Sequence, residues 1–329
     1  MKKKINTGIT RCFIVIILFF FVQNCYSQDS IYVKPFPQNF SVMLFGAYKY
    51  NNVLHQHILG EYTFEPNKPL TIGIGFIGER VGLRLGYGFE FLKNKNKVNT
   101  EFIDLQYHYY GRKFLFDAIL QNYKGFHLTN KDNDVDQDLY NNLSTFKSGI
   151  FGQYVFNHDK FSYRAAYNLR DQQIKSSGSF LLGAGIYYSE IHFDGQYLFE
   201  DSIGGGRLKL INFQMGPSAG YAHSWVIAKK IIIFASISAG INLGFNGKFI
   251  NFTAYPTVIP RFAVGYNMNS WSFNFSYVND VIYSYINDNS KIGLSSGSLQ
   301  LSILKRFNMK NKFYMKVNNY IDKLLPGSK

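Results

Sequence analysis

Histidines two positions from another ionisable residue are the first candidates for chemistry in this chain. His192 precedes Asp194 at this spacing, so in an extended strand the two side chains would share a face and could act as an acid–base pair. His55 and His57 have the same spacing and could bind a metal ion together. A polar residue near a strand end explains either pair more simply. We therefore assign no catalytic residue and no metal ligand.

Two further motifs fail when compared with the chemistry that they imply. Residues 73–78 match the G-x-G-x-x-G dinucleotide fingerprint, but that site needs a helix after the loop, and the strand-like stretch 80–91 follows instead. Four aspartates alternate through 132–138, but an EF-hand counted from the first would need Gly and Glu where Gln137 and Leu143 stand. Looser cation binding by these aspartates is the alternative to a solvated loop. We expect no cofactor.

The elements that would position these residues repeat with a period of two. Between 80 and 91 every odd position is apolar, and every even position is charged or glycine. Such alternation predicts a strand with two chemically different faces. The stretch 231–245 is apolar enough to suggest a helix, but small polar residues keep to one parity, so a strand is predicted there too. Further strands are predicted at 100–110, 113–123, 161–170 and 271–277, and near 54–64, 70–78, 143–156, 177–193, 207–222, 252–267 and 296–307.

Strand length and composition favour a membrane barrel over its alternative, a soluble β-sandwich. Sandwich strands average about five or six residues, whereas strands that cross a bilayer need about nine to eleven. Aromatic residues make up 18% of the chain and charged residues 17%, as expected for an aromatic outer band around a polar interior. Because a bilayer tolerates no unpaired sheet edge, we predict an all-β fold, a closed antiparallel transmembrane β-barrel of about 12 strands, with 10 to 14 possible. Long polar connections are predicted at 129–142, 194–206 and 285–295.

The first 27 residues have the order of a cleaved signal peptide. Basic residues at positions 2–4 and 11 precede an apolar run over 12–22, and the small residue Ser27 ends the segment. Lipid attachment at Cys25 is the alternative, although Asn24 is not the small residue expected before such a cysteine. Both cysteines of the chain lie in this segment, so we expect no disulfide and no cysteine chemistry in the exported protein.

The exported part would be basic and would consist of one large domain. Removal of the signal peptide leaves 31 basic and 21 acidic residues, a net charge of +10, which in an exported chain suits anionic lipid head groups rather than nucleic acid. We divide the chain into a signal peptide (1–27), an N-terminal lead-in (28–38), the outer-membrane β-barrel (39–307) and a periplasmic C-terminal tail (308–329).

A set of charged residues is predicted to face the lumen of the barrel. Its members belong to the polar faces of neighbouring predicted strands and carry both signs, so cross-strand ion pairs are expected. Such pairs either fill the interior or line a narrow pore. The predicted lumen-facing residues are Arg80, Arg84, Glu90, Asp104, His108, Lys113, Asp117 and Arg164.

Four short segments carry a resemblance to a known family. These are YYGRKF at 109–114, YKGF at 123–126, SSGSFLLG at 176–183 and GYAHSW at 220–225. With these segments the chain resembles the domain-of-unknown-function 4421 family, exported proteins of Bacteroidetes-type bacteria, over roughly 40–307. The resemblance implies an outer-membrane barrel. It transfers no catalytic residue, because that family has no established activity.

The expected location is the outer membrane of a Gram-negative envelope, with its lipids, lipopolysaccharide and the barrel assembly machinery as partners. The expected role is a structural barrel or a narrow passive channel for small solutes, and whether it has any enzymatic activity is left open. One alternative is a barrel enzyme acting on lipid or peptide, with His192, Asp194 and His223 as its candidates; Ser224 follows His223 directly, so a strand would point the two apart. Another is a binding protein that uses loops 129–142 and 285–295.

Overall fold

The computed structural model describes residues 31–57, 60–68, 70–78, 82–89, 98–129, 139–194, 207–245, 252–287 and 290–309. The predicted signal peptide and most of the predicted tail lie outside these residues. Along the chain the elements are β1 (Val33–Pro35), β2 (Phe40–His57), β3 (Gly60–Glu65), β4 (Thr71–Ile77), β5 (Gly82–Gly88), β6 (Glu101–Tyr110), β7 (Phe114–Thr129), β8 (Leu139–Val155), α2 (Tyr163–Tyr167), β9 (Asp171–Gln173), β10 (Ser177–Asp194), β11 (Arg207–Ile227), β12 (Ile231–Phe245), β13 (Phe252–Asn267), β14 (Trp271–Asn287) and β15 (Ser290–Phe307).

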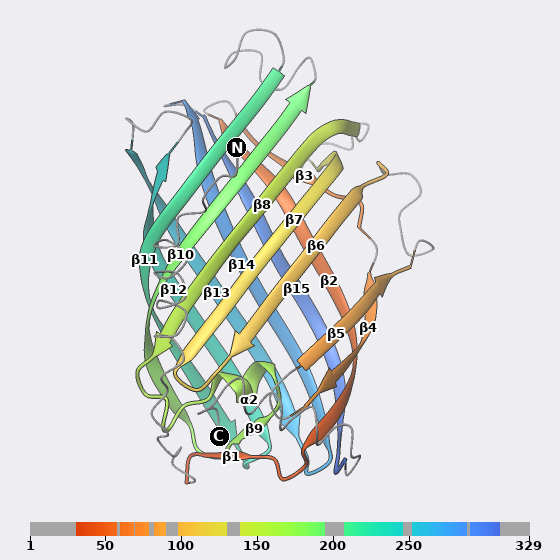
Figure 1. Cartoon of the computed structure of the whole chain (residues 1–329), viewed down its shortest axis with the longest axis vertical. Helices are drawn as coiled ribbons and strands as arrows, with labels where there is room; N and C mark the ends of the chain where they lie inside the picture. The colour runs from red at the N-terminus through yellow and green to blue at the C-terminus, as the bar shows by residue number, and fades with distance from the viewer. Residues whose placement is uncertain are drawn as a thin grey trace, which may run out of the picture.

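Ten of the described strands form a closed antiparallel barrel (Figure 1). The hydrogen-bonded order is β15-β14-β13-β12-β11-β10-β8-β7-β3-β2, and β2 pairs with β15 along its whole length to close the ring. β13 and β14 pair over 261–267 and 272–278. The predicted closed barrel is confirmed, but the number of about twelve strands is corrected to ten, because β4, β5 and β6 pair with the ring without completing it.

The region of β3 to β6 is where the sheet departs from a simple ring. β3 and β4 follow each other along one edge of β2, at 53–57 and 41–47 respectively. β3 also pairs with β7 and so closes the ring at one end. Farther along the barrel, β5 pairs with β4 and β6 pairs with β7, but among the described residues no ladder joins β5 to β6. We call these two facing edges of β5 and β6 the seam.

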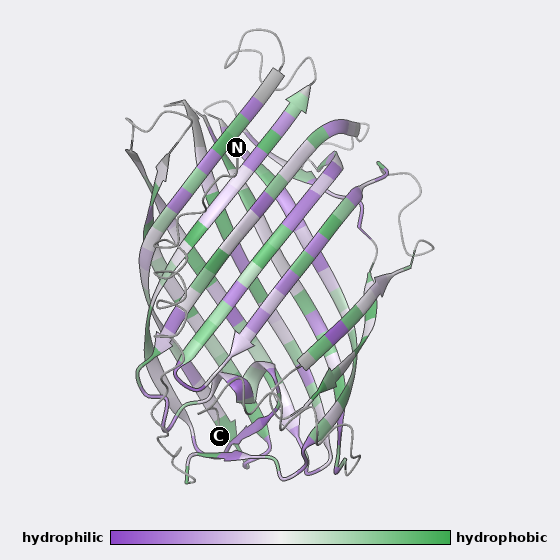
Figure 2. Ribbon diagram, viewed as in Figure 1, coloured by the Kyte–Doolittle hydropathy of each residue, from purple (hydrophilic) through white to green (hydrophobic). Residues whose placement is uncertain are grey.

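Hydrophobic and hydrophilic residues alternate along the strands (Figure 2), and their burial gives the barrel an apolar outside and a polar inside. In β12, Ile237 and Ile241 are more than half exposed, whereas Ser236 and Ser238 are buried in the lumen. Aromatic side chains lie on the outer surface near the ends of several strands, as in the interfacial belts of membrane barrels. The outward aromatic residues include Phe156, Phe180, Tyr221, Trp225, Trp271 and Phe307. None of the helices in the described part of the chain is long and apolar enough to span a membrane.

The chain between β8 and β10 folds into one end of the barrel and forms a plug with the N-terminal segment. β1 pairs with β9, and α2 lies beside this small sheet inside the barrel end (Figure 1). The plug, defined as residues 31–36 and 157–176, packs apolar and aromatic side chains against the wall. The predicted strand at 161–170 is therefore wrong. This segment is enclosed on all sides, so its alternation does not report a two-faced strand.

Two further predicted boundaries are corrected. The predicted run 54–64 joins the end of β2 to β3, which are separate antiparallel strands. The predicted polar loop 285–295 is mostly strand, because β14 continues to Asn287 and β15 begins at Ser290. Consequently this region offers no long loop for binding a partner. The predicted loops 129–142 and 194–206 lie largely outside the described residues.

Candidate functional site

The inward face of β6 carries a chain of polar contacts beside the seam. Asp104 is central: its carboxylate lies 2.8 Å from Nζ of Lys68 and accepts a 2.8 Å hydrogen bond from the Tyr123 hydroxyl. Gln106 donates to the other Asp104 oxygen at 2.8 Å, and its own side-chain oxygen lies 3.3 Å from Nε2 of His108. The alternation of β6 thus places three consecutive inward side chains in contact with one another.

A second cluster crosses the lumen from β6 and β7 to the opposite side of the barrel. Nδ1 of His108 lies 2.6 Å from Asp117, and the guanidinium of Arg261 on β13 donates to the other oxygen of the same carboxylate. Asp117 and Arg261 are both buried. An ion pair in this environment holds together only when both charges are present, so these residues connect the strand beside the seam to the far wall.

A third cluster neutralises another buried cation. Nζ of Lys147 on β8 lies 2.8 Å from Asp280 on β14 and 3.0 Å from the hydroxyl of Ser296 on β15. Ser296 also donates to Gln121 at 3.1 Å, and Asn51 donates to the same Gln121 oxygen at 3.2 Å. The polar lumen is therefore spanned by bonded networks at its centre rather than by a ring of free charges.

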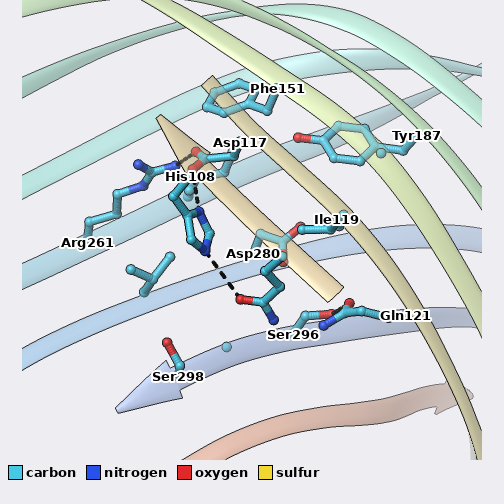
Figure 3. Close-up of a pocket in the computed structure, with 15 residues that line it drawn as sticks. His108, Asp117, Ile119, Gln121, Phe151, Tyr187, Arg261, Asp280, Ser296 and Ser298 are labelled. Atoms are coloured by element: carbon cyan, nitrogen blue, oxygen red, sulfur yellow. Dashed lines mark hydrogen bonds and ion pairs between the residues drawn. The ribbon is translucent and has the colours of Figure 1, made fainter. Parts of the chain in front are cut away.

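These clusters surround a cavity in the lumen, of which about 80 Å³ is open to the centre of a water molecule (Figure 3). Polar groups and apolar side chains both line it. The polar part comes from the clusters described above, and the apolar part from strands on several sides. The residues that line the cavity are Gln106, His108, Asp117, Ile119, Gln121, Gly149, Phe151, Tyr187, Ile259, Arg261, Val278, Asp280, Ser296, Gly297 and Ser298.

The predicted lumen-facing residues separate into four groups. Asp104, His108 and Asp117 lie together in the clusters that surround the cavity. Arg84 and Arg164 instead meet the plug: Nη2 of Arg84 donates to the backbone oxygen of Tyr167 at 3.1 Å, and Arg164 lies within α2, 3.5 Å from Asp171. Lys113 lies in the turn between β6 and β7, near the plugged end. Arg80 and Glu90 lie outside the described residues.

The prediction missed Lys68, Lys147, Arg261 and Asp280. Parity does not identify Arg261, because Tyr255, Ile259 and Ala263 on the same parity of β13 are apolar, although all three are buried. Lys68 follows the end of β3, in a segment whose alternation is interrupted by Pro66 and Pro69, so no parity could place it.

Of the predicted histidine pairs, the side chains of His57 and Asp194 lie outside the described ones, so the structure describes one partner of each pair. Nε2 of His192 lies 3.1 Å from Glu190 on the same face of β10. His55 is buried and its ring stacks on Tyr62 with the centroids 6.0 Å apart. His223 lies between outward aromatic side chains, 4.6 Å from the ring of Trp225. No group of three potential metal-ligating His, Cys, Asp or Glu residues occurs in the described part of the chain, and residues 132–138 lie outside it.

The plug is held by one aromatic cluster and a few polar contacts. The Tyr163 ring lies 4.8 Å from that of Phe234 on β12, and its hydroxyl is 2.7 Å from that of Ser236. Tyr110, at the end of β6, packs on Tyr163 and Tyr167 with centroid distances of 5.9 and 5.3 Å. Burial raises the pKa of both plug tyrosines above the usual value for tyrosine, so their hydroxyl groups stay neutral in alkaline solution as well.

A closed antiparallel β-barrel with an apolar outer surface, a polar lumen and an internal plug has the architecture of the outer-membrane barrel proteins. The chain belongs to the family described as Domain of unknown function (DUF4421), whose model matches residues 27–323. This match confirms the resemblance found in the sequence. A search of curated proteins finds no match.

Solved structures show distant similarity over most of the chain. The translocator domain of the autotransporter NalP from Neisseria meningitidis is 12% identical, with a TM-score of 0.36, over 92% of this chain and 96% of that chain. The toluene transporter TodX from P. putida is 8% identical, with a TM-score of 0.26, over 83% of this chain and 91% of that chain. Similarities of this size define no shared substrate.

Proposed function

We propose that this protein is an outer-membrane β-barrel that is closed at rest and becomes a narrow conduit for small solutes when its plug moves. The outer surface supports a location in lipid: Leu85, Leu105 and Leu301 expose more than half of their side chains and come from strands around the barrel. Outer-membrane lipids, lipopolysaccharide and, during insertion, the barrel assembly machinery are the partners that this location implies.

The observation that carries the proposal is the polar lumen. Several buried lumen atoms have no hydrogen-bond partner among the described residues, including Oδ1 of Asn51, Asn212 and Asn274 and Nη1 of Arg261. Buried polar atoms of this kind are normally satisfied by water. A barrel that served only as a support could fill its interior with apolar side chains. A hydrated lumen that ends at a plug supports the conduit.

The test compares the conductance of the wild-type barrel with that of a variant that lacks α2 and β9 of the plug. Residues 159–175 are replaced by an Asn-Gly turn, which joins β8 to β10 directly. Both proteins are reconstituted in planar bilayers after boiled and unboiled samples have shown a heat-dependent gel mobility. We expect discrete conductance steps from the variant and a silent wild type.

A point variant keeps the test decisive if the deletion does not fold. Tyr167→Ala removes one aromatic ring from the plug cluster and should produce brief openings. Tyr221→Ala is the matched control, because Tyr221 lies on the outer surface. Folded plug variants that pass neither ions nor small neutral solutes would contradict the conduit and leave a purely structural barrel.

A further inference from the structure

The lumen cavity lies directly behind the seam. Gln106 and His108 line it from β6, the strand whose other edge has no ladder among the described residues. His108 and Arg84 point inward from the two seam strands and are nevertheless exposed. Their exposure beside an edge that has no ladder among the described residues indicates a gap in this part of the wall. The cavity is therefore adjacent to the opening and is not deep within a sealed interior.

The apolar side of the cavity holds one free hydroxyl group. Ile119, Phe151, Ile259 and Val278 supply apolar walls. Tyr187 is 4% exposed, and its hydroxyl points among the lining side chains (Figure 3) but makes no hydrogen bond with the described residues. A cavity that combines apolar walls with a small number of placed polar groups is typical of sites for small molecules.

The charged side chains of the cavity are already compensated. Asp117 is paired with Arg261, and Asp280 with Lys147 at 2.8 Å. A charged ligand would find no unpaired counter-charge among the described residues that line the cavity. The chemistry of the lining thus selects against ions and in favour of an uncharged molecule.

The size of the cavity limits the ligand further. A cavity with about 80 Å³ open to water centres holds several water molecules or one small organic molecule. Such a molecule can reach the cavity from the lipid, since Leu83, Leu85, Leu105 and Tyr107 make the outer faces of both seam strands apolar.

We propose that the cavity binds a small uncharged molecule with an apolar body and one hydroxyl or carbonyl group, which enters from the lipid through the seam. The hydroxyl of Tyr187 bonds the polar group, and Phe151 and Val278 contact the body. This inference deepens the proposed function, on which it rests, by naming the class of solute that the conduit takes.

Binding is measured by fluorine NMR on the full barrel in lipid nanodiscs. Three fluorinated benzene derivatives serve as probes. We expect saturable binding of 4-fluorophenol, about tenfold weaker binding of fluorobenzene because it lacks the hydrogen bond, and no saturable binding of 4-fluorobenzoate. Empty nanodiscs correct for partition into lipid.

Matched variants locate the site. Tyr187→Phe should weaken 4-fluorophenol binding about tenfold, whereas Tyr188→Phe, on the opposite face of β10, should leave it unchanged. Val278→Phe should fill the cavity and abolish binding, whereas Val258→Phe, on the outer surface, should not. Equal binding of the benzoate, or equal affinity in Tyr187→Phe and Val278→Phe, would overturn the proposal, as would no saturable binding at all.

The route is tested with a single thiol. The chain has no cysteine after residue 25, so Gln106→Cys introduces a unique label site in the cavity once the signal peptide is removed. We expect a lipid-soluble maleimide to react at least tenfold faster than a charged maleimide in water, with Leu105→Cys as the lipid-facing control. Faster reaction with the charged reagent would overturn entry through the seam.

The two proposals can fail separately. If the plug variant conducts but the barrel does not bind 4-fluorophenol, the conduit is retained and this solute class is rejected. If the barrel binds 4-fluorophenol but the plug variant does not conduct, the conduit is rejected and the binding site is retained.

Discussion

The wall formed by β10, β11 and β12 and the region of β4, β5 and β6 differ in how much of their backbone is paired. The wall strands have 18, 21 and 15 residues, and β11 pairs along both edges. The seam-region strands have 7, 7 and 10 residues, and β5 and β6 each pair along one edge among the described residues. Because unpaired backbone groups are costly in lipid, the fully paired wall should keep its conformation. We expect conformational change of the barrel at the seam, where backbone pairing is incomplete.

The plug connects these two regions from the inside. Arg84 on β5 and Tyr110 on β6 both contact Tyr167 of α2, one from each side of the seam. The same helix packs through Tyr163 against Phe234 of the wall. The position of the seam strands is therefore linked to the plug, and a movement of α2 would release both strands together.

The largest expected effect comes from the ion pair that joins the seam side to the far wall. Asp117→Ala leaves Arg261 buried without its counter-charge, which should lower the free energy of unfolding by about 3–5 kcal/mol. Urea titration followed by gel mobility of unboiled samples measures the loss. The double variant Asp117→Leu with Arg261→Met should recover most of it. A loss below about 1 kcal/mol in Asp117→Ala would show that the two regions are not coupled through this pair.

Hydrogen exchange should separate the two regions directly. Amides of β5 lack a ladder on the seam side, so we expect them to exchange about a hundredfold faster than amides of β12, which is paired on both edges. Mass spectrometry of the barrel in nanodiscs measures both segments in one sample. Equal protection of β5 and β12 would mean that the seam is paired in solution and would remove the contrast.

A pair of glycines tests how tightly the wall is packed. A Cβ at Gly216 of β11 would lie 2.1 Å from the backbone oxygen of Ile241, whereas a Cβ at Gly46 of β2 would meet nothing within 4 Å. Gly216→Ala should therefore cost about 1–3 kcal/mol of stability, and Gly46→Ala less than about 0.5 kcal/mol. The same urea titration compares them. Similar values for the two variants would contradict the close packing of β11 against β12.

The smallest expected effect concerns the contact of the plug with the wall. Tyr163→Phe removes only the hydroxyl that bonds Ser236 at 2.7 Å, so stability should fall by about 1 kcal/mol. Tyr266→Phe, on the outer surface of β13, serves as the control and should change little. If the two variants behave alike, the plug is held by aromatic packing alone.

Alternation predicted the long strands well because each of them has lipid on one face and the lumen on the other. The predicted strands at 231–245 and 252–267 coincide with β12 and β13. The same rule failed at 161–170, where Tyr163 and Tyr167 lie four residues apart and both pack on Phe234. In the plug every side chain has a neighbour, so a period of two carries no information about a face.

The candidate site was only partly predictable. Asp104, His108 and Asp117 were placed in the lumen by parity, and the structure brings them together. Their partner Arg261 comes from a strand more than 140 residues later, and nothing in local sequence indicates which distant strand faces β7 across a barrel. The seam could not be predicted either, because β3 and β4 divide one edge of β2 between them.

Arg306, next to the last residue of β15, has a consequence for the order in which the barrel assembles. Its guanidinium lies 3.4 Å from the ring centroid of Phe36 near the N-terminal end of the described chain, and it donates to the backbone oxygen of Leu169 in the plug at 3.0 Å. These contacts require β15, the last of the described strands along the chain, which also closes the ring against β2. Such long sequence separations make the step slow. Docking of the plug and closure of the barrel should therefore occur as one late, cooperative folding event.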